Sequence, residues 1–161
     1  MKSEEKVLNF LENNYGYITT KDILNLKISK PTIKFLINKR VIERVDRGLY
    51  MNSNIIKDEY YILQKKYKSV VYSYNTALHI LNLTNRAPMK IDITVPRDKR
   101  VRGNYNVHRV SDKLYPIGII ETISPYGNPV KVYNAERCIC DMIRDEKEFD
   151  LELQNRVLDY Y

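Results

Sequence analysis

An α+β fold in two parts is predicted by the order of the sequence patterns. Residues 16–51 contain two short helical patterns joined by a tight connection and followed by a small basic hairpin. This order is typical of a winged helix-turn-helix, a module that places its second helix in the DNA major groove. After residue 56, short apolar runs typical of strands alternate with helical patterns. We therefore predict a winged helix-turn-helix over residues 1–55 and a mixed α/β domain over residues 56–161.

The composition narrows the class of protein. With 43% hydrophobic and 29% charged residues, the chain is expected to be a folded globular protein. No apolar run approaches the roughly 18 residues of a membrane span, and the start of the chain lacks the apolar core of a signal peptide. We therefore expect a cytoplasmic protein without a membrane partner. The net charge of +7 favours phosphate backbones or acidic partners.

The charge is unevenly distributed. The excess of Lys and Arg lies within residues 1–131, whereas residues 132–161 carry more Asp and Glu. We expect the acidic residues 132–161 to form either a surface with a different role from the basic one or simply a solvated helix face.

The first helix is expected to begin after Ser3, a favourable N-cap residue, and to end near Gly16. Its apolar residues recur at helical spacing: Val7, Leu8 and Leu11. Residues 17–18 then suit a short extended segment. A second helix is predicted from Thr19 to about Leu26, because Thr19 and Asp22 form a capping box with a shorter acid.

The third helix has the clearest start signal. Ser29 is a suitable N-cap and Pro31 lies in the first turn. An apolar stripe is expected to pack on the preceding helix, and it consists of Ile33, Leu36 and Ile37. The outward face then contains Lys30, Thr32, Lys34 and Asn38. Phe35 lies near the boundary of the two faces, and the pattern does not place it.

A hairpin follows the third helix and forms the predicted wing. Residues 43–45 and 49–51 read as strands around a turn at residues 46–48, where Gly48 permits the positive φ that tight hairpins need. A helix from about Ile56 to Tyr67 is expected to connect the two parts.

After that connecting helix, five strands and three further helices are predicted in the second part. The strands are residues 70–72, 90–95, 104–110, 118–123 and 130–133. Residues 90–95 alternate polar and apolar side chains, as a half-buried strand does, and Pro96 is expected to end this strand. Ser73 is expected to cap a helix through about Leu81, and Asn134 a helix that includes Cys138. The last predicted helix spans residues 151–161.

The candidate DNA-binding residues lie on the third helix and the hairpin. A helix N-terminus favours phosphate, and an Arg at a hairpin tip can enter the minor groove or contact the flanking backbone. A Lys-rich face alone would indicate only solvation, but the helix start, the hairpin and the charge excess together favour DNA contact. The predicted set is Lys30, Thr32, Lys34, Asn38, Lys39, Arg44 and Arg47.

A second basic cluster follows the predicted strand at residues 90–95. Two interpretations stay open, an extension of the nucleic-acid footprint or a solvated loop. The cluster consists of Arg97, Lys99, Arg100 and Arg102.

Enzyme chemistry has little support in the sequence. His79 and His108 belong to no nucleophile or metal motif, and Cys138 and Cys140 point about 200° apart on a helix, so they cannot share a metal. Buried structural thiols are expected for both cysteines. A nuclease-like group is conceivable, because phosphodiesterases place carboxylates beside a cation, and its residues would be Asp92, Glu121 and Lys131. We expect no enzyme activity, no metal and no cofactor.

Several short motifs, in order, resemble the AbiEi-type antitoxins of bacterial type IV toxin–antitoxin (abortive infection, phage defence) systems. The hairpin ends in RGLY (47–50), similar to that family's R-G-[VL]-Y. Residues 73–78 (SYNTAL) with 81–84 (LNLT) look like its S-x-x-[ST]-A-L…h-x-L-[TS] segment. Residues 91–96 (IDITVP) are similar to its next strand, and residues 135–141 (AERCICD) look like its [PA]-E-R-x-h-x-D helix.

The resemblance implies a non-enzymatic antitoxin that also represses its own operon. Its winged helix would bind repeats in double-stranded DNA of its own promoter, and the second part would counter a nucleotidyltransferase-like toxin, without an assumed direct complex. The family leads us to expect further helices beyond Tyr161, so a shortened chain is expected. A ligand-responsive winged-helix transcription factor, unrelated to a toxin, is the alternative from the residues alone.

Arg137 and Asp141 have two possible roles in the AERCICD segment. Four residues apart on a helix, they can form an exposed pair worth a few tenths of a kcal/mol. If Arg137 is buried under the sheet instead, it would anchor strand to helix, and its loss would cost more.

Overall fold

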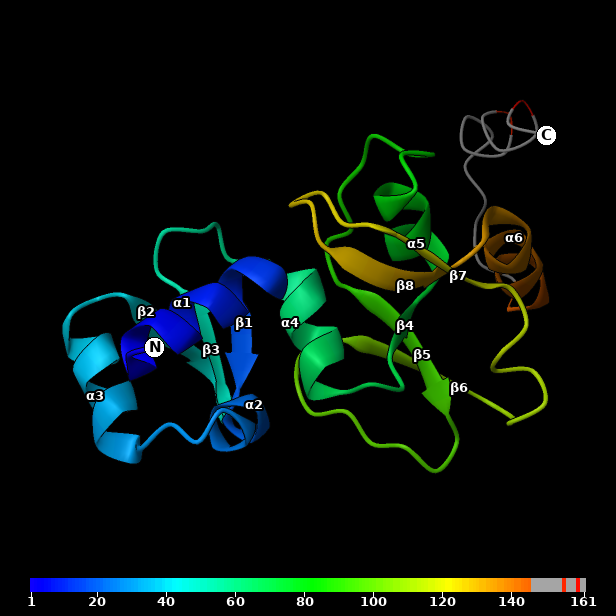
Figure 1. The fold of residues 1–161 in the computed structure, drawn as a ribbon. Helices are drawn as coiled ribbons and strands as arrows, with labels where there is room; N and C mark the ends of the chain where they lie inside the picture. The colour runs from blue at the N-terminus through cyan, green and yellow to red at the C-terminus, as the bar shows by residue number, and fades with distance from the viewer. Residues whose placement is uncertain (146–154, 156–158, 160–161) are drawn as a thin grey trace. The chain divides into compact units, whose positions relative to one another are not determined.

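The computed structural model describes residues 1–145, 155 and 159, and within them the chain is an α+β protein with six helices and two sheets (Figure 1). The predicted α+β class is therefore confirmed. The chain divides into two compact units, Met1–Asp58 and Glu59–Tyr161. None of the described helices is long and apolar enough to cross a membrane.

The first unit combines three helices with a three-stranded antiparallel sheet of order β1-β3-β2 (Figure 1). The predicted elements of this unit are all present. In chain order they are α1 (Ser3–Asn13), β1 (Tyr17–Thr19), α2 (Thr20–Asn25), α3 (Lys30–Asn38), β2 (Ile42–Asp46) and β3 (Leu49–Asn52).

The core of the first unit is aliphatic and draws on every helix. Ile33 and Leu36 of the predicted stripe are buried and Ile37 is partly buried, so the predicted inner face of α3 is confirmed. The other buried members of this core are Val7, Leu11, Ile18, Ile23, Ile28 and Ile42.

Two of the three helices in the first unit begin at the N-cap residue that the sequence predicts. The Thr19 backbone N–H donates to the Asp22 carboxylate (2.9 Å), completing the predicted capping box. Ser29 caps α3, and its Oγ accepts from the Thr32 N–H (3.3 Å). The prediction for α1 is wrong, since Ser3 is already helical and Lys2 is the N-cap residue. Lys2 makes no side-chain cap bond, and the Glu5 carboxylate accepts from the Lys2 N–H (2.9 Å), which is the other bond of a capping box.

The second unit is built on a mixed five-stranded sheet of order β6-β5-β4-β8-β7 (Figure 1). The predicted helix at 56–67 begins later, at Glu59, and the predicted helix at 151–161 lies outside the described segments. The elements are α4 (Glu59–Lys66), β4 (Val71–Tyr72), α5 (Tyr74–Ile80), β5 (Asp92–Pro96), β6 (Asn106–Val110), β7 (Ile119–Ile123), β8 (Pro129–Tyr133) and α6 (Ala135–Arg144).

Helices cover both faces of this sheet. The Tyr72 hydroxyl donates to the Tyr60 carbonyl of α4 (2.7 Å), so Tyr72 faces α4. Tyr72 pairs with Val132, and alternation directs the next residue, Tyr133, to the other face, where Arg137 of α6 lies over its ring. α4 and α6 therefore lie on opposite faces.

Burial of β5 differs from the prediction. All five of its residues are buried, whereas the alternating pattern predicts a half-buried strand. β5 lies inside the sheet, between β6 and β4, so its polar side chains Asp92 and Thr94 are covered as well. Pro96, expected to follow the strand, is its last residue.

Four of the described helices end in the same left-handed turn. The N–H two residues past the C-cap donates to the carbonyl five residues earlier, the bond of the Schellman motif. These bonds join Gly16 to Leu11 (2.8 Å), Ile28 to Ile23 (3.1 Å), Val41 to Leu36 (3.0 Å) and Leu83 to Leu78 (2.8 Å). The residue that follows each C-cap has positive φ and is never glycine: Tyr15 (56°), Lys27 (56°), Arg40 (58°) and Asn82 (60°).

The side chain of Gln64 in α4 extends the short strand β4. Its Nε2 donates to the carbonyls of Val70 (3.0 Å) and Lys131 (2.8 Å), and its Oε1 accepts from the Lys131 N–H (2.9 Å). The amide thus occupies the place of another strand residue beside β8, where backbone groups would otherwise lack partners.

Replacing Gln64 should therefore weaken the second unit. We expect Gln64→Leu to lower the free energy of unfolding by about 1–3 kcal/mol, because backbone groups lose their bonds. Urea unfolding followed by circular dichroism measures this as a lower midpoint. Lys68→Ala, an exposed change just after the same helix, is the control and should alter the midpoint little. Equal midpoints for both variants would contradict this role of Gln64.

Candidate functional site

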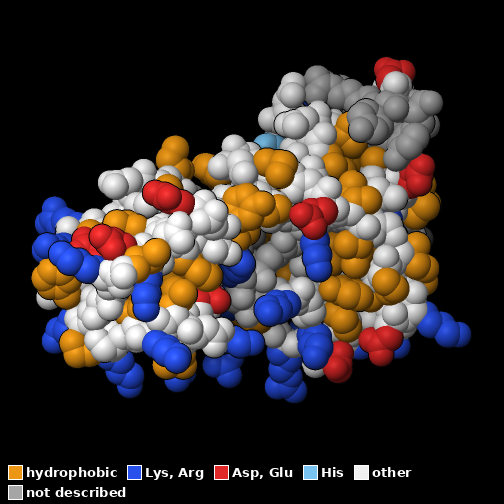
Figure 2. Space-filling view, viewed as in Figure 1, with side chains coloured by type: hydrophobic (Ala, Val, Ile, Leu, Met, Phe, Trp, Pro, Cys, Tyr) orange, Lys and Arg blue, Asp and Glu red, His pale blue; other side chains and the backbone are white. Residues whose placement is uncertain are grey.

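The outward face of α3 is exposed and cationic. Lys30, Lys34, Asn38 and Lys39 are all exposed, and the sequence of α3, KPTIKFLIN, contains no carboxylate. Because helical residues follow one another at about 100°, burial of Ile33 and Leu36 turns these side chains outward. Lys and Arg side chains gather over this part of the first unit in Figure 2.

Thr32 differs from the other predicted contacts on α3. It is only partly exposed, and its hydroxyl lies 2.8 Å from the Ser29 hydroxyl. Its backbone N–H also donates to Ser29. Thr32 therefore takes part in capping the helix.

The structure places Phe35, which the sequence pattern leaves undecided. Its side chain is 48% exposed on the cationic face. The Lys39 ammonium lies 4.5 Å from the ring centroid, a distance typical of a cation–π contact. The outward face of α3 thus combines cations with one accessible aromatic ring.

The hairpin carries the remaining predicted contacts, Arg44 and Arg47, both exposed. Arg44 Nε donates to the Asp46 carbonyl (3.3 Å), and the Arg47 N–H donates to the Asp46 carboxylate (2.6 Å). Gly48 has φ of 72°, as the sequence predicts, and its carbonyl accepts from the Thr20 N–H (2.9 Å). The turn is therefore held to the start of α2.

The second basic cluster lies in the segment that joins β5 to β6. All four of its cations are exposed, namely Arg97, Lys99, Arg100 and Arg102. Lys99 lies 3.9 Å from the Asp98 carboxylate, which offsets part of its charge.

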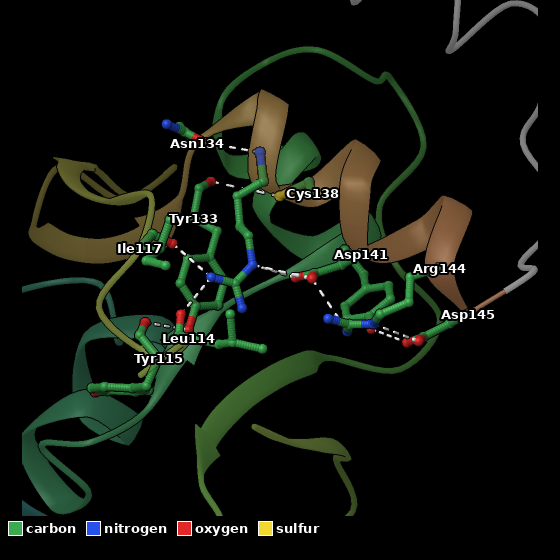
Figure 3. Close-up of polar contacts among 11 residues, drawn as sticks. Leu114, Tyr115, Ile117, Tyr133, Asn134, Cys138, Asp141, Arg144 and Asp145 are labelled. Carbon is green, nitrogen blue, oxygen red and sulfur yellow. Dashed lines mark hydrogen bonds and ion pairs between the residues drawn. The ribbon is translucent and has the colours of Figure 1, made fainter. Parts of the chain in front are cut away.

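A polar network in the second unit includes Asp141, Leu114 and Ile117 (Figure 3), and all three are bonded to Arg137. Its Nε lies 3.0 Å from both Asp141 oxygens, and its Nη1 donates to the carbonyls of Leu114 (2.6 Å) and Ile117 (2.7 Å). Its guanidinium carbon lies 4.4 Å from the Tyr133 ring centroid. The Arg137 and Asp141 side chains are 8% and 3% exposed, so the buried alternative is the observed one.

A cavity of about 430 Å³ lies beside this network. Its two cationic side chains, Arg137 and Arg144, are both engaged: Arg137 with Asp141, and Arg144 with Asp141 (3.2 Å) and Asp145 (3.1 Å). The charges lining the cavity therefore stabilise the local fold, and they offer no unpaired cation of their own to an anionic ligand.

A second polar cluster surrounds Tyr74, which has a positive φ of 50° at the start of α5. The Tyr74 ring stacks on His108, with centroids 3.9 Å apart, and His108 Nε2 lies 3.0 Å from the Asp92 carboxylate. The Tyr74 hydroxyl donates to the Asp145 carboxylate. That bond lowers the pKa of Asp145, with a smaller contribution from Arg144, while burial raises the pKa of Tyr74.

The nuclease-like group does not form. Asp92 lies in β5 and Glu121 in β7, and the strand order places β4 and β8 between them, a separation of about 14 Å at 4.8 Å per strand. Glu121 pairs with Lys131 across β7 and β8, whereas Asp92 is buried against His108. Among the described residues no group of three or more potential ligands could hold a metal ion.

The two cysteines differ from each other. Cys138 is buried as expected, and burial raises the pKa of its thiol to about 12, which makes this thiol unreactive at neutral pH. Cys140 is exposed, so the expectation of a buried thiol is wrong there. Residues two apart on α6 face opposite sides, and only Cys138 faces the core.

Comparison with known proteins gives no assignment. No protein-family model matches the chain, and no curated protein sequence matches it. The likeness of the short motifs therefore supports a proposal rather than family membership.

Replacing Arg137 alone should destabilise the fold more than replacing both Arg137 and Asp141. We expect Arg137→Met to lower the free energy of unfolding by about 3–5 kcal/mol, because Asp141 is left buried without its partner. The double variant Arg137→Met with Asp141→Leu should recover part of this loss. A double-mutant cycle from urea unfolding measures the coupling, and additive losses would contradict the pairing.

The bond between Tyr74 and Asp145 should make stability pH-dependent. The pKa of Asp145 lies below its ordinary 3.8 in the folded protein, so the stabilisation is complete above that pH and is lost as pH falls through the folded value. Tyr74→Phe should therefore destabilise the protein most near neutral pH and less near pH 3.

Tyr115→Phe is a matched control for that experiment. The Tyr115 hydroxyl donates to the Ser69 carbonyl (2.7 Å), which does not titrate, so its loss should be the same at both pH values. Urea unfolding at pH 7 and pH 3 compares the two variants. A loss for Tyr74→Phe that does not change with pH would refute the role of Asp145.

Proposed function

We propose that the chain is a DNA-binding autorepressor and antitoxin of a type IV toxin–antitoxin operon, and that its first unit is a winged helix-turn-helix. The observation that carries the DNA-binding part is the exposed, carboxylate-free face of α3. In this proposal α3 enters the major groove and the β2–β3 hairpin is the wing.

The arrangement of the cations supports contact with a duplex. Lys30 lies in the first turn of α3, where helix N–H groups favour a phosphate. Arg47 is exposed at the tip of the hairpin, where an arginine can contact the minor groove or its backbone. Phosphate contacts of this kind fix the register of a protein on DNA.

The antitoxin part rests on the motif resemblance. Residues 135–141 form the start of α6, and there Arg137 and Asp141 make the buried pair, so the chain's version of that motif has a structural reason. The partner in this proposal is a nucleotidyltransferase-like toxin, opposed without an assumed direct complex. Neither a catalytic step nor a cofactor is part of the proposal.

A ligand-responsive transcription factor is the second candidate, and the cavity beside Arg137 is the observation that favours it. The neighbouring gene distinguishes the two. A nucleotidyltransferase-like reading frame downstream supports the antitoxin, whereas metabolic genes alone support the sensor.

Binding to the chain's own upstream DNA tests the repressor directly. Fluorescence anisotropy with the native duplex and a scrambled duplex, over a salt series, should show a preference of about 4 kcal/mol or more, the lower end for specific regulators. Equal binding to both duplexes, with affinity falling steeply in salt, would leave only phosphate contact and overturn the autorepressor.

Single cations should contribute measurably to that affinity. We expect Lys34→Ala and Arg47→Ala to weaken binding and to reduce the slope of log K against log salt by about 0.9 for each phosphate that is no longer neutralised. Lys113→Ala, an exposed lysine of the second unit, is the charge-matched control. If all three variants matched the parent at equal salt, the assignment of α3 and the hairpin would be wrong.

The antitoxin is tested by co-expression with the adjacent toxin candidate in bacteria. Growth should be restored by the parent protein and by Lys34→Ala, because repression and antagonism belong to different units in the proposal. No rescue by the parent would remove the antitoxin part and leave the repressor.

A further inference from the structure

The outward face of α3 has a centre and two flanks. At about 100° per residue, the direction opposite Ile33 and Leu36 falls on Pro31 and Asn38, and Phe35 and Lys34 lie about 50° to either side of it. Lys30 and Lys34 lie to one side of this centre, and Lys39 and the partly exposed Thr32 lie to the other. The two central residues are therefore uncharged, with Lys34 next to them on one side and Phe35 on the other.

This distribution matches the chemistry of a major groove. Phosphates line both walls of the groove, and base edges form its floor. A helix in the groove places its flanks near phosphates and its centre over bases. The lysines of α3, with long charged side chains, then suit the backbone, whereas Asn38 at the centre and Phe35 beside it suit the base edges.

Asn38 and Phe35 each fit one half of an A·T base pair. An amide offers a donor and an acceptor together, and asparagine pairs with adenine N6 and N7 through both. An apolar side chain contacts the thymine methyl group, which guanine and cytosine lack. The two residues are three apart on α3, so they are neighbours on its surface.

Phe35 is accessible to a ligand placed against the outward face of α3. Its side chain is 48% exposed, and the Lys39 ammonium lies over the ring at 4.5 Å. A large exposed aromatic side chain gains little in water, but it excludes water when a methyl group is placed against it.

We infer that α3 reads an A·T base pair or an adjacent A·T step, with Asn38 on the adenine and Phe35 on the thymine methyl group. The inference rests on the proposed function, because it needs α3 in a major groove. It adds a sequence preference and assigns Phe35, which charge alone does not identify.

Modified duplexes test the two contacts separately. In the native upstream duplex, each thymine is replaced in turn by deoxyuridine, which lacks only the methyl group, and each adenine by 7-deazaadenine, which lacks only the N7 acceptor. For the parent, at least one deoxyuridine should weaken binding about fourfold, near the value of one methyl group. At least one 7-deazaadenine should weaken binding about tenfold.

The variants assign each effect to a residue. Phe35→Ala should bind the deoxyuridine and thymine duplexes with equal affinity. Asn38→Ala should bind the 7-deazaadenine and adenine duplexes with equal affinity. Lys34→Ala should weaken all duplexes alike and keep both responses. Ile123→Ala, which removes an exposed apolar side chain of β7 (57%), should behave as the parent. Both test residues are exposed, so thermal unfolding should show parental stability.

The outcomes separate this inference from the proposed function. Preference for the native duplex without any response to either modified base would overturn the inference and leave the repressor intact. Responses that persist in Phe35→Ala and Asn38→Ala would do the same. No preference for the native duplex would overturn both.

Discussion

The two apolar side chains that α3 buries, Ile33 and Leu36, determine which of its other residues reach solvent. Burying these two residues in the core of the first unit sets the rotation of α3 about its axis. That rotation determines the direction in which each of its nine side chains points. The Schellman bond from Val41 to Leu36 uses the same residue to direct the chain into β2. One leucine thus sets the rotation of α3 and the start of the hairpin.

In the second unit the comparable role belongs to a charged group. Arg137 joins α6 to the 114–117 segment and to the ring of Tyr133 in β8, and Asp141 neutralises it at a buried position. Gly118 follows that segment, and a Cβ there would lie 2.8 Å from the Arg137 Cβ. The close approach of the segment to α6 therefore requires glycine as well as arginine.

Local chemistry makes most elements predictable, and tertiary pairing explains the rest. The capping box at Thr19, the Ser29 and Asn134 caps and Gly48 are signals within a few residues, and each is present in the structure. Burial of the whole of β5 depends on its place inside the sheet, which no local pattern gives. The pattern leaves Phe35 undecided for a similar reason, because its exposure depends on how α3 docks. The pairing of Arg137 with Asp141 can be predicted from their separation of four residues on a helix, but the burial of the pair cannot.

Arg40 follows α3 in the left-handed conformation, a backbone state that costs an ordinary residue roughly 1 kcal/mol. Glycine there would remove most of that cost, and Lys27 after α2 presents the same choice. Both positions are exposed cations of the first unit. Selection for thermostability alone would therefore favour glycine at these two turns, whereas selection for positive surface charge favours lysine or arginine. This chain has a cation at both turns.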